Sequence, residues 1–148
     1  MTASLRRESD VAKNESGYVY NRNRQVFLAT ELNVADTHWS RLCGLLNVPA
    51  SRFHSGKGLW IVPCRGVHTF AMSYPIDVLY LDRDKAIVHC EENVRPWRLT
   101  GVRVDAVSVL ELPAHMVFRT GTQIGDSLEI NFHGDSHTES ARTTQAAD

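Results

Sequence analysis

The stretch Gly58-Leu-Trp-Ile-Val-Pro-Cys-Arg-Gly-Val-His-Thr-Phe-Ala-Met-Ser-Tyr-Pro-Ile-Asp-Val-Leu-Tyr-Leu-Asp82 decides the fold of this 148-residue chain. It holds three apolar runs of strand-like composition, Leu59–Val62, Val67–Met72 and Ile76–Leu81, separated by turn residues. The last run is apolar at every position from Val78 onward, so we predict that this strand lies inside a sheet rather than at its edge. The stretch therefore predicts a β-rich core.

Apolar runs of similar length recur along the chain, rich in the branched and aromatic residues that favour strands. These further runs are Gln25–Leu32, Ala86–Cys90, Ala106–Leu112, Met116–Thr120 and Ser127–Phe132. Polar turn sequences separate them, among them Asp82–Lys85 as a hairpin connection and Ile124–Ser127 before the last run. The series predicts a mainly β domain, either a compact sandwich of jelly-roll character or a barrel-like sheet.

One segment has a different period. Apolar residues between Trp39 and Leu46 recur at helical spacing, and Asp36 is suited to the N-cap position. Pro49 disfavours helical backbone in the residue before it. We therefore predict one short α-helix near residues 36–46.

Both ends of the chain are polar and have too little apolar surface to offset the entropy lost on ordering. We predict a flexible N-terminal segment at residues 1–17, a single β domain at residues 18–132 and a disordered polar tail at residues 133–148. The start has no apolar segment of the secretory type, which favours a cytoplasmic location. In that compartment Cys43, Cys64 and Cys90 stay thiols.

The composition limits the classes of protein to which this chain can belong. The 43% apolar and 22% charged fractions are those of an ordinary globular domain. The chain has 16 basic and 17 acidic residues, so its overall charge favours neither a nucleic acid partner nor a membrane surface. Common motifs for phosphate binding, dinucleotide binding, serine hydrolysis and zinc proteolysis are missing from the sequence. The large, easily recognised enzyme classes are therefore disfavoured.

The order of short motifs in the core resembles a known prokaryotic family. The matching blocks are Arg41 with Gly44-Leu-Leu46, Gly58-Leu-Trp60, His68–Met72, Pro75–Asp82, Arg95–Arg98, Val109–Ala114 and Ile124–Leu128. Together, over roughly residues 30 to 130, they are similar to domain-of-unknown-function family 192. The resemblance implies a compact, mainly β domain with a short helix. It implies no catalytic residue, because that family has none established.

The chain departs from this family at His115, where relatives usually have glycine. A histidine there requires either a strained backbone or a different local turn. Many relatives also look exported, so the resemblance implies nothing about the location of this chain.

His68 and Asp77 form the most prominent polar pair, with the types of side chain that act in acid–base chemistry. If Ser73–Pro75 were a three-residue hairpin loop, strand alternation would place the two side chains on opposite faces of the sheet. We therefore interpret Asp77 mainly as a structural acceptor for loop N–H groups or an arginine, with ligand binding or catalysis as the alternative. His68 either fills the sheet against Tyr80 or lies at the rim of a pocket.

Cys64 precedes Arg65, a cation that can lower the pKa of a neighbouring thiol. Cys64 and His68 can also be interpreted as half of a metal site, but no second pair at zinc spacing accompanies them. We therefore predict no metal and no cofactor.

Arg95-Pro-Trp-Arg98 is the motif that most resembles an interaction site, because its guanidinium groups are suited to bind a carboxylate or phosphate group. Trp and Arg also dominate binding hot spots. The alternative is an ordered loop in which Trp97 caps the barrel and the arginines bond to carbonyls or to Asp77.

The sequence favours a non-enzymatic module that binds a small molecule, a peptide or a protein through His68, Asp77, Arg95, Trp97 and Arg98. The alternative is a hydrolase or metal-assisted enzyme that uses Cys64, His68 and Asp77, and it requires these three groups to meet in one cleft.

Overall fold

The computed structural model describes residues 16–37, 41, 44–46 and 48–133. These residues form a single seven-stranded sheet in the order β5-β4-β6-β3-β2-β1-β7. The strands are β1 (Gly17–Asn21), β2 (Val26–Ala35), β3 (Lys57–Ile61), β4 (Ile76–Leu81), β5 (Ile87–Val94), β6 (Ser108–Pro113) and β7 (Leu128–Phe132). The described helices are the 3-10 turn η1 (Ala50–Arg52) and the short helix α2 (Met116–Thr120). β2 and β3 pair in parallel, whereas the other neighbours pair antiparallel.

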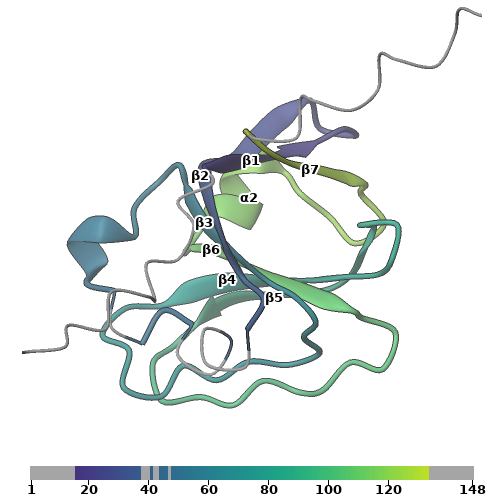
Figure 1. Cartoon of the computed structure of the whole chain (residues 1–148). Helices are drawn as coiled ribbons and strands as arrows, with labels where there is room; N and C mark the ends of the chain where they lie inside the picture. The colour runs from purple at the N-terminus through teal and green to yellow at the C-terminus, as the bar shows by residue number, and fades with distance from the viewer. Residues whose placement is uncertain (1–15, 38–40, 42–43, 47, 134–148) are drawn as a thin grey trace, which may run out of the picture.

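The sheet curls until its two edge strands, β5 and β7, approach each other at one corner. There the Ile87 N–H donates to the Asp126 carbonyl at 2.9 Å and the Leu128 N–H donates to the Lys85 carbonyl at 3.0 Å. In Figure 1, β1 and β7 lie above β4 and β5, with α2 between them. The result is a half-barrel, so the barrel-like form of the predicted mainly β fold is confirmed.

The curl gives the sheet an inner and an outer core. The inner core holds Val19, Leu28, Ala29, Leu32, Leu79, Leu81, Ile87, Leu110, Leu112, Met116, Val117 and Leu128. The outer core holds Ala35, Leu45, Phe53, Leu59, Ile61, Val67, Met72, Ile76, Val78, Tyr80, Val94, Ala106 and Val109, and the long loops cover it. Alternate residues of β4 and β6 belong to opposite cores, because side chains alternate along a strand. Polar side chains at neighbouring positions of these strands therefore enter different cores.

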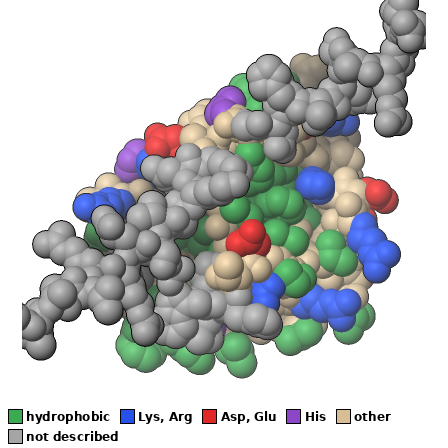
Figure 2. All heavy atoms as spheres, in the orientation of Figure 1, with side chains coloured by type: hydrophobic (Ala, Val, Ile, Leu, Met, Phe, Trp, Pro, Cys, Tyr) green, Lys and Arg blue, Asp and Glu red, His purple; other side chains and the backbone are tan. Residues whose placement is uncertain are grey.

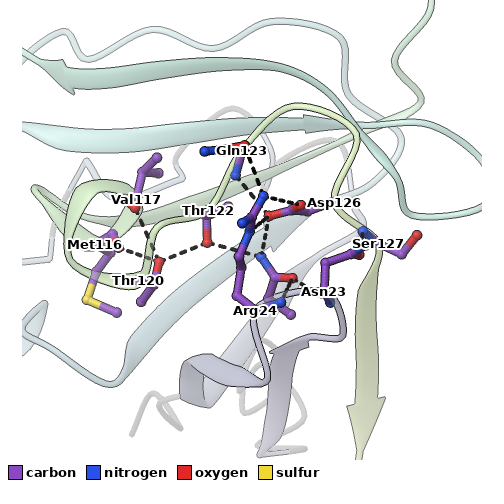
Figure 3. A network of polar contacts seen from close by, with 10 residues as sticks. Asn23, Arg24, Met116, Val117, Thr120, Thr122, Gln123, Asp126 and Ser127 are labelled. Atoms are coloured by element: carbon purple, nitrogen blue, oxygen red, sulfur yellow. Dashed lines mark hydrogen bonds and ion pairs between the residues drawn. The ribbon is translucent and has the colours of Figure 1, made fainter.

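A polar network around the buried residues Asn21, Thr122 and Asp126 joins the β1–β2 turn to the loop before β7 (Figure 3). The carboxylate of Asp126 accepts hydrogen bonds from Asn21 Nδ2 at 3.0 Å, Arg24 Nε at 2.9 Å and the Gln123 N–H at 2.9 Å. Asn21 Nδ2 also lies 3.1 Å from the Thr122 hydroxyl. These groups satisfy one another where the edges of the sheet converge.

Several sequence predictions are confirmed. All six residues of β4 are buried, and β4 lies between β5 and β6 rather than at an edge. The polar segment after β4 is the expected hairpin connection, in which Asp82 Oδ1 accepts the N–H groups of Asp84 and Ala86 at 2.9 Å. Gly125 has a φ of 93°, a backbone conformation that suits glycine in the turn before β7.

The prediction of a strand at Met116–Thr120 is wrong, because this segment is the helix α2. Its adjacent residues Met116 and Val117 are buried while Phe118 is exposed, a pattern that a strand does not produce. His115 adopts left-handed backbone at φ 72° and turns the chain out of β6, and Gly121 at φ 64° ends the helix.

The predicted strand at Val67–Met72 is also wrong, as is the hairpin that was expected to join it to β4. The segment pairs instead with the loop before β6: the Thr69 N–H donates to the Arg98 carbonyl at 2.8 Å, and the Thr100 N–H donates to the Val67 carbonyl at 3.0 Å. The chain turns at Ala71, whose φ of 61° is left-handed. Strand β4 takes β5 and β6 as its partners.

Part of the predicted helix at residues 36–46, namely residues 38–40 and 42–43, lies outside the described residues. Within the described part, the Arg41 N–H donates to the Thr37 carbonyl at 3.0 Å, the spacing of one helical turn. Of the terminal segments predicted at residues 1–17 and 133–148, residues 1–15 and 134–148 also lie outside the described residues, whereas Gly17 is the first residue of β1.

Candidate ligand-binding cavity

A cavity of about 280 Å³ lies against the outer face of the sheet. Its walls come from β3 and β6 and from the loops that cover the outer core. The lining residues are Arg41, Gly44, Leu45, Leu46, Ile61, Pro63, Cys64, Gly66, Val67, His68, Phe70, Met72 and Glu111. Most of them are apolar, so the few polar side chains stand out as groups that can orient a ligand.

Glu111 is the most unusual of these side chains. It lies in β6, opposite Leu59 in β3 and Val78 in β4, and is only 3% exposed. Its Oε2 atom has no hydrogen-bond partner within the described part of the chain. Burial away from water raises the pKa of this carboxyl to about 8, because the charged form loses its hydration. At neutral pH the group is therefore mainly an uncharged acid.

His68 and Cys64 line the same cavity. The His68 ring stacks on Phe70 with 5.2 Å between the ring centres, and its Nδ1 atom is buried without a hydrogen-bond partner among the described residues. The Cys64 Sγ donates to the Gly66 carbonyl at 3.1 Å. Burial raises the pKa of this thiol, so the expected lowering by the neighbouring arginine does not prevail.

Asp77 lies on the inner face of β4, among residues that face α2. It is completely buried. Its Oδ1 accepts the Asn93 N–H at 2.9 Å and its Oδ2 accepts the Val117 N–H at 2.9 Å. These contacts are consistent with a structural acceptor of backbone N–H groups, but the donors belong to β5 and α2 rather than to a loop. Asp77 and His68 are therefore apart, although the hairpin from which we inferred their separation does not form.

The loop with Arg95, Trp97 and Arg98 lies beside the cavity rather than in it. Thr69 holds its backbone, since the Trp97 N–H donates to the Thr69 carbonyl at 2.9 Å and the Arg98 N–H donates to Thr69 Oγ1 at 2.9 Å. Trp97 is 66% exposed at a left-handed φ of 63°, so it does not cap a buried barrel. Its ring centre lies 6.3 Å from that of Phe70, a residue of the cavity wall.

Arg95 and Arg98 line a separate, shallow hollow with Glu91 and Glu92. Further apolar side chains of this loop, at Leu99, Val102 and Val104, are exposed. Figure 2 shows hydrophobic side chains protruding along the lower margin of the molecule, the side on which the loop before β6 runs in Figure 1. The loop beside the cavity therefore presents an apolar surface with interspersed arginines.

Comparison with known proteins decides the family. The family model for DUF192, described as Uncharacterized ACR, matches residues 19–130. This chain belongs to the DUF192 family.

Curated relatives of this DUF192 protein bear the name UPF0127. A UPF0127 protein of Thermococcus sibiricus is 25% identical over 114 residues, which cover 74% of this chain and 71% of the relative. A UPF0127 protein of Pyrococcus abyssi is 27% identical over 119 residues, which cover 76% of this chain and 97% of the relative.

Solved structures share the DUF192 fold. A protein of unknown function from Novosphingobium aromaticivorans superposes with a TM-score of 0.65 at 17% identity, over 77% of this chain and 83% of the other. A Sinorhizobium meliloti protein described as a candidate transcription regulator superposes with a TM-score of 0.66 at 24% identity, over 78% of this chain and 92% of the other. At these identities the likeness shows the fold alone.

The structure assembles a different set of polar groups in this DUF192 domain from the set that the sequence suggested. Cys64 and His68 meet Glu111 at the cavity, while Asp77 lies across the sheet. Sequence reasoning missed Glu111, whose signal is a single acidic residue inside the apolar run Val109-Leu-Glu-Leu112.

Within the described part of the chain, no cluster of His, Cys, Asp and Glu is arranged to hold a metal ion. None of the described helices is long and apolar enough to cross a membrane.

Proposed function

We propose that this DUF192 domain is a binding module that holds a small molecule in the cavity above Glu111. The observation that carries the proposal is a carboxyl group buried at an apolar cavity with one oxygen unpaired among the described residues. Leaving a buried polar atom unpaired costs about 1–3 kcal/mol, so such an atom calls for an explanation. A ligand that bonds to it supplies one.

The size and chemistry of the cavity support this proposal. Its volume of about 280 Å³ is close to the lower end of typical ligand pockets. Leu45, Ile61 and Met72 provide an apolar wall, whereas His68 and Glu111 provide polar atoms that fix an orientation. This combination of apolar wall and few polar anchors is typical of small-molecule sites.

The alternative of a hydrolase that uses Cys64, His68 and Asp77 has less support. Asp77 lies on the opposite face of the sheet with both oxygens bonded to backbone N–H groups. The Cys64 thiol donates to a backbone carbonyl, and burial raises its pKa, so little of the reactive thiolate forms at neutral pH.

A ligand screen tests the proposal. A broad metabolite panel is tested by thermal shift, because binding to the native state alone raises the melting temperature. Hits are then mapped by amide chemical shifts in two-dimensional NMR. We expect changes at His68, Phe70 and Glu111, and weaker binding in Glu111→Ala than in the matched surface variant Glu92→Ala. Failure of the whole panel, or hits that map only to the inner face of the sheet, would contradict the proposal.

A further inference from the structure

The polar side chains at the cavity share one property at neutral pH: each can donate a hydrogen bond. Glu111 is 3% exposed among apolar neighbours, and this burial disfavours its charged form. It is therefore held as an uncharged acid, which has one O–H donor. A buried carboxylic acid of this kind acts as a donor at neutral pH in other binding and catalytic sites.

The other groups at the cavity have the same character. His68 Nδ1 is buried without a partner among the described residues and donates when it carries the ring proton. Arg41 brings a fixed positive charge to the lining, and its Nη1 lies 3.4 Å from the Asp36 carbonyl. The Cys64 thiol already donates to Gly66. The described lining thus holds donors and a positive charge, and Glu111 is its one acidic carboxyl group.

We propose that the ligand is a small organic acid, whose carboxylate accepts hydrogen bonds from Glu111 and His68 while its short apolar body packs against Ile61 and Met72. This inference rests on the proposed function and adds the chemical class of the ligand. A carboxylate complements both the donors and the positive charge of Arg41. An amine would meet the same positive charge and would have to draw the buried Glu111 into its costly ionised form.

The pH dependence follows from the same geometry. When Glu111 loses its proton, its O–H donor is replaced by a negative charge that repels the ligand carboxylate. Among the described residues, Cys64, His68 and Arg41 line the cavity with Glu111, and burial, with the nearby Glu111, raises the pKa of the Tyr74 phenol to about 12. Above neutral pH, Glu111 is therefore the first of the acids at this cavity to ionise.

Three probes of matched shape test the inference: butanoate, butanamide and 1-aminobutane. Their affinities are measured by NMR titration at about pH 7 and about pH 9.5, on either side of the Glu111 pKa. We expect butanoate to bind at least tenfold more tightly than 1-aminobutane at neutral pH and to weaken roughly tenfold or more at the higher pH. Glu111→Gln keeps a permanent N–H donor and has no titratable group, so it should retain butanoate binding and lose the pH dependence. Glu92→Gln is the surface control and should behave as the unchanged protein.

The outcomes separate the two proposals. Tighter binding of 1-aminobutane, equal binding of butanamide and butanoate, or an unchanged pH profile in Glu111→Gln would overturn the organic acid. So would the failure of all three probes when other molecules of the panel bind at the cavity, although the proposed function would then stand. If no molecule of any class binds there, both proposals fail.

Discussion

At the scale of single residues, His115 has an energetically unfavourable backbone conformation that the rest of the structure maintains. It is exposed, yet it holds a left-handed φ of 72° with no side-chain hydrogen bond to the start of α2. Left-handed backbone costs a residue with a Cβ atom roughly 1–2 kcal/mol, and glycine avoids this cost. We expect His115→Gly to raise the free energy of unfolding by about 1 kcal/mol, as measured by urea denaturation.

The control for this prediction is His115→Ala, which removes the imidazole but keeps the Cβ atom. It should leave stability close to that of the unchanged chain, because the backbone strain persists. Equal effects of the two substitutions would mean that the side chain, not the backbone, sets the stability at this position.

Glu111 gives a second prediction at this scale. The pKa of this carboxyl is about 8 in the folded protein, against an ordinary value of 4.5. Between these two values the unfolded chain has released the proton while the folded chain retains it, so the free energy of unfolding falls as pH rises. We expect the stability of Glu111→Gln relative to the unchanged chain to increase across this window by up to about 1.4 kcal/mol for each pH unit, and to level off above it. Parallel stability curves would contradict the raised pKa.

The candidate site was only partly predictable from single residues. His68 was found because a histidine within an apolar run is conspicuous, and the structure places it at the cavity. Glu111 is equally conspicuous in its own run, but the core that it enters depends on the position of β6 between β3 and β4. Those partners are distant in sequence, so local alternation could not assign the face.

At the scale of elements, strands with strong apolar runs were predictable and their partners were not. The boundaries of β4 were predicted to the residue, because its apolar run ends at a polar turn. α2 was missed because its five residues have strand-like composition, and tertiary contacts rather than propensity stabilise it. Chief among these contacts is the hydrogen bond from the Val117 N–H to Asp77, which satisfies a backbone donor that the start of a helix leaves unpaired.

Asp77 therefore ties three elements together, and its removal should be costly. It joins β4 to the end of β5 through Asn93 and to α2 through Val117. We expect Asp77→Asn to lower the free energy of unfolding by about 2–4 kcal/mol, because an amide group replaces one acceptor oxygen and leaves a backbone N–H unpaired. Urea denaturation measures the loss, with Asp105→Asn as the exposed control. A loss no larger than in the control would contradict the assigned role.

At the scale of the whole molecule, the curl of the sheet is the feature that the sequence did not determine. The runs predicted a β domain but left a sandwich, a jelly roll and a barrel open, because each uses strands of the same composition. The outcome depends on long-range pairing, such as the parallel pairing of β2 with β3 and the approach of β5 to β7. The strand β1 was not predicted at all, although it joins β2 to the edge strand β7.

Asp126 lies at the corner where the edge strands β5 and β7 meet. A substitution of Asp126 therefore tests whether the closure of the curled sheet contributes to stability. Its pKa is lowered, first by the hydrogen bond from Arg24 and further by bonds from Asn21 and the Gln123 N–H. A lowered pKa stabilises the fold above the ordinary value of 3.8, and this contribution is lost as pH falls through the lower, folded value. We expect Asp126→Asn to destabilise the protein by about 2 kcal/mol at neutral pH and by progressively less under acidic conditions. Glu31→Gln, which removes the exposed ion pair with Lys57, should have little effect. Two outcomes would contradict this role: a loss of stability in Asp126→Asn no larger than in the control, or a loss that does not become smaller toward acid pH. The backbone hydrogen bonds between β5 and β7 would then close the sheet without the side chains around Asp126.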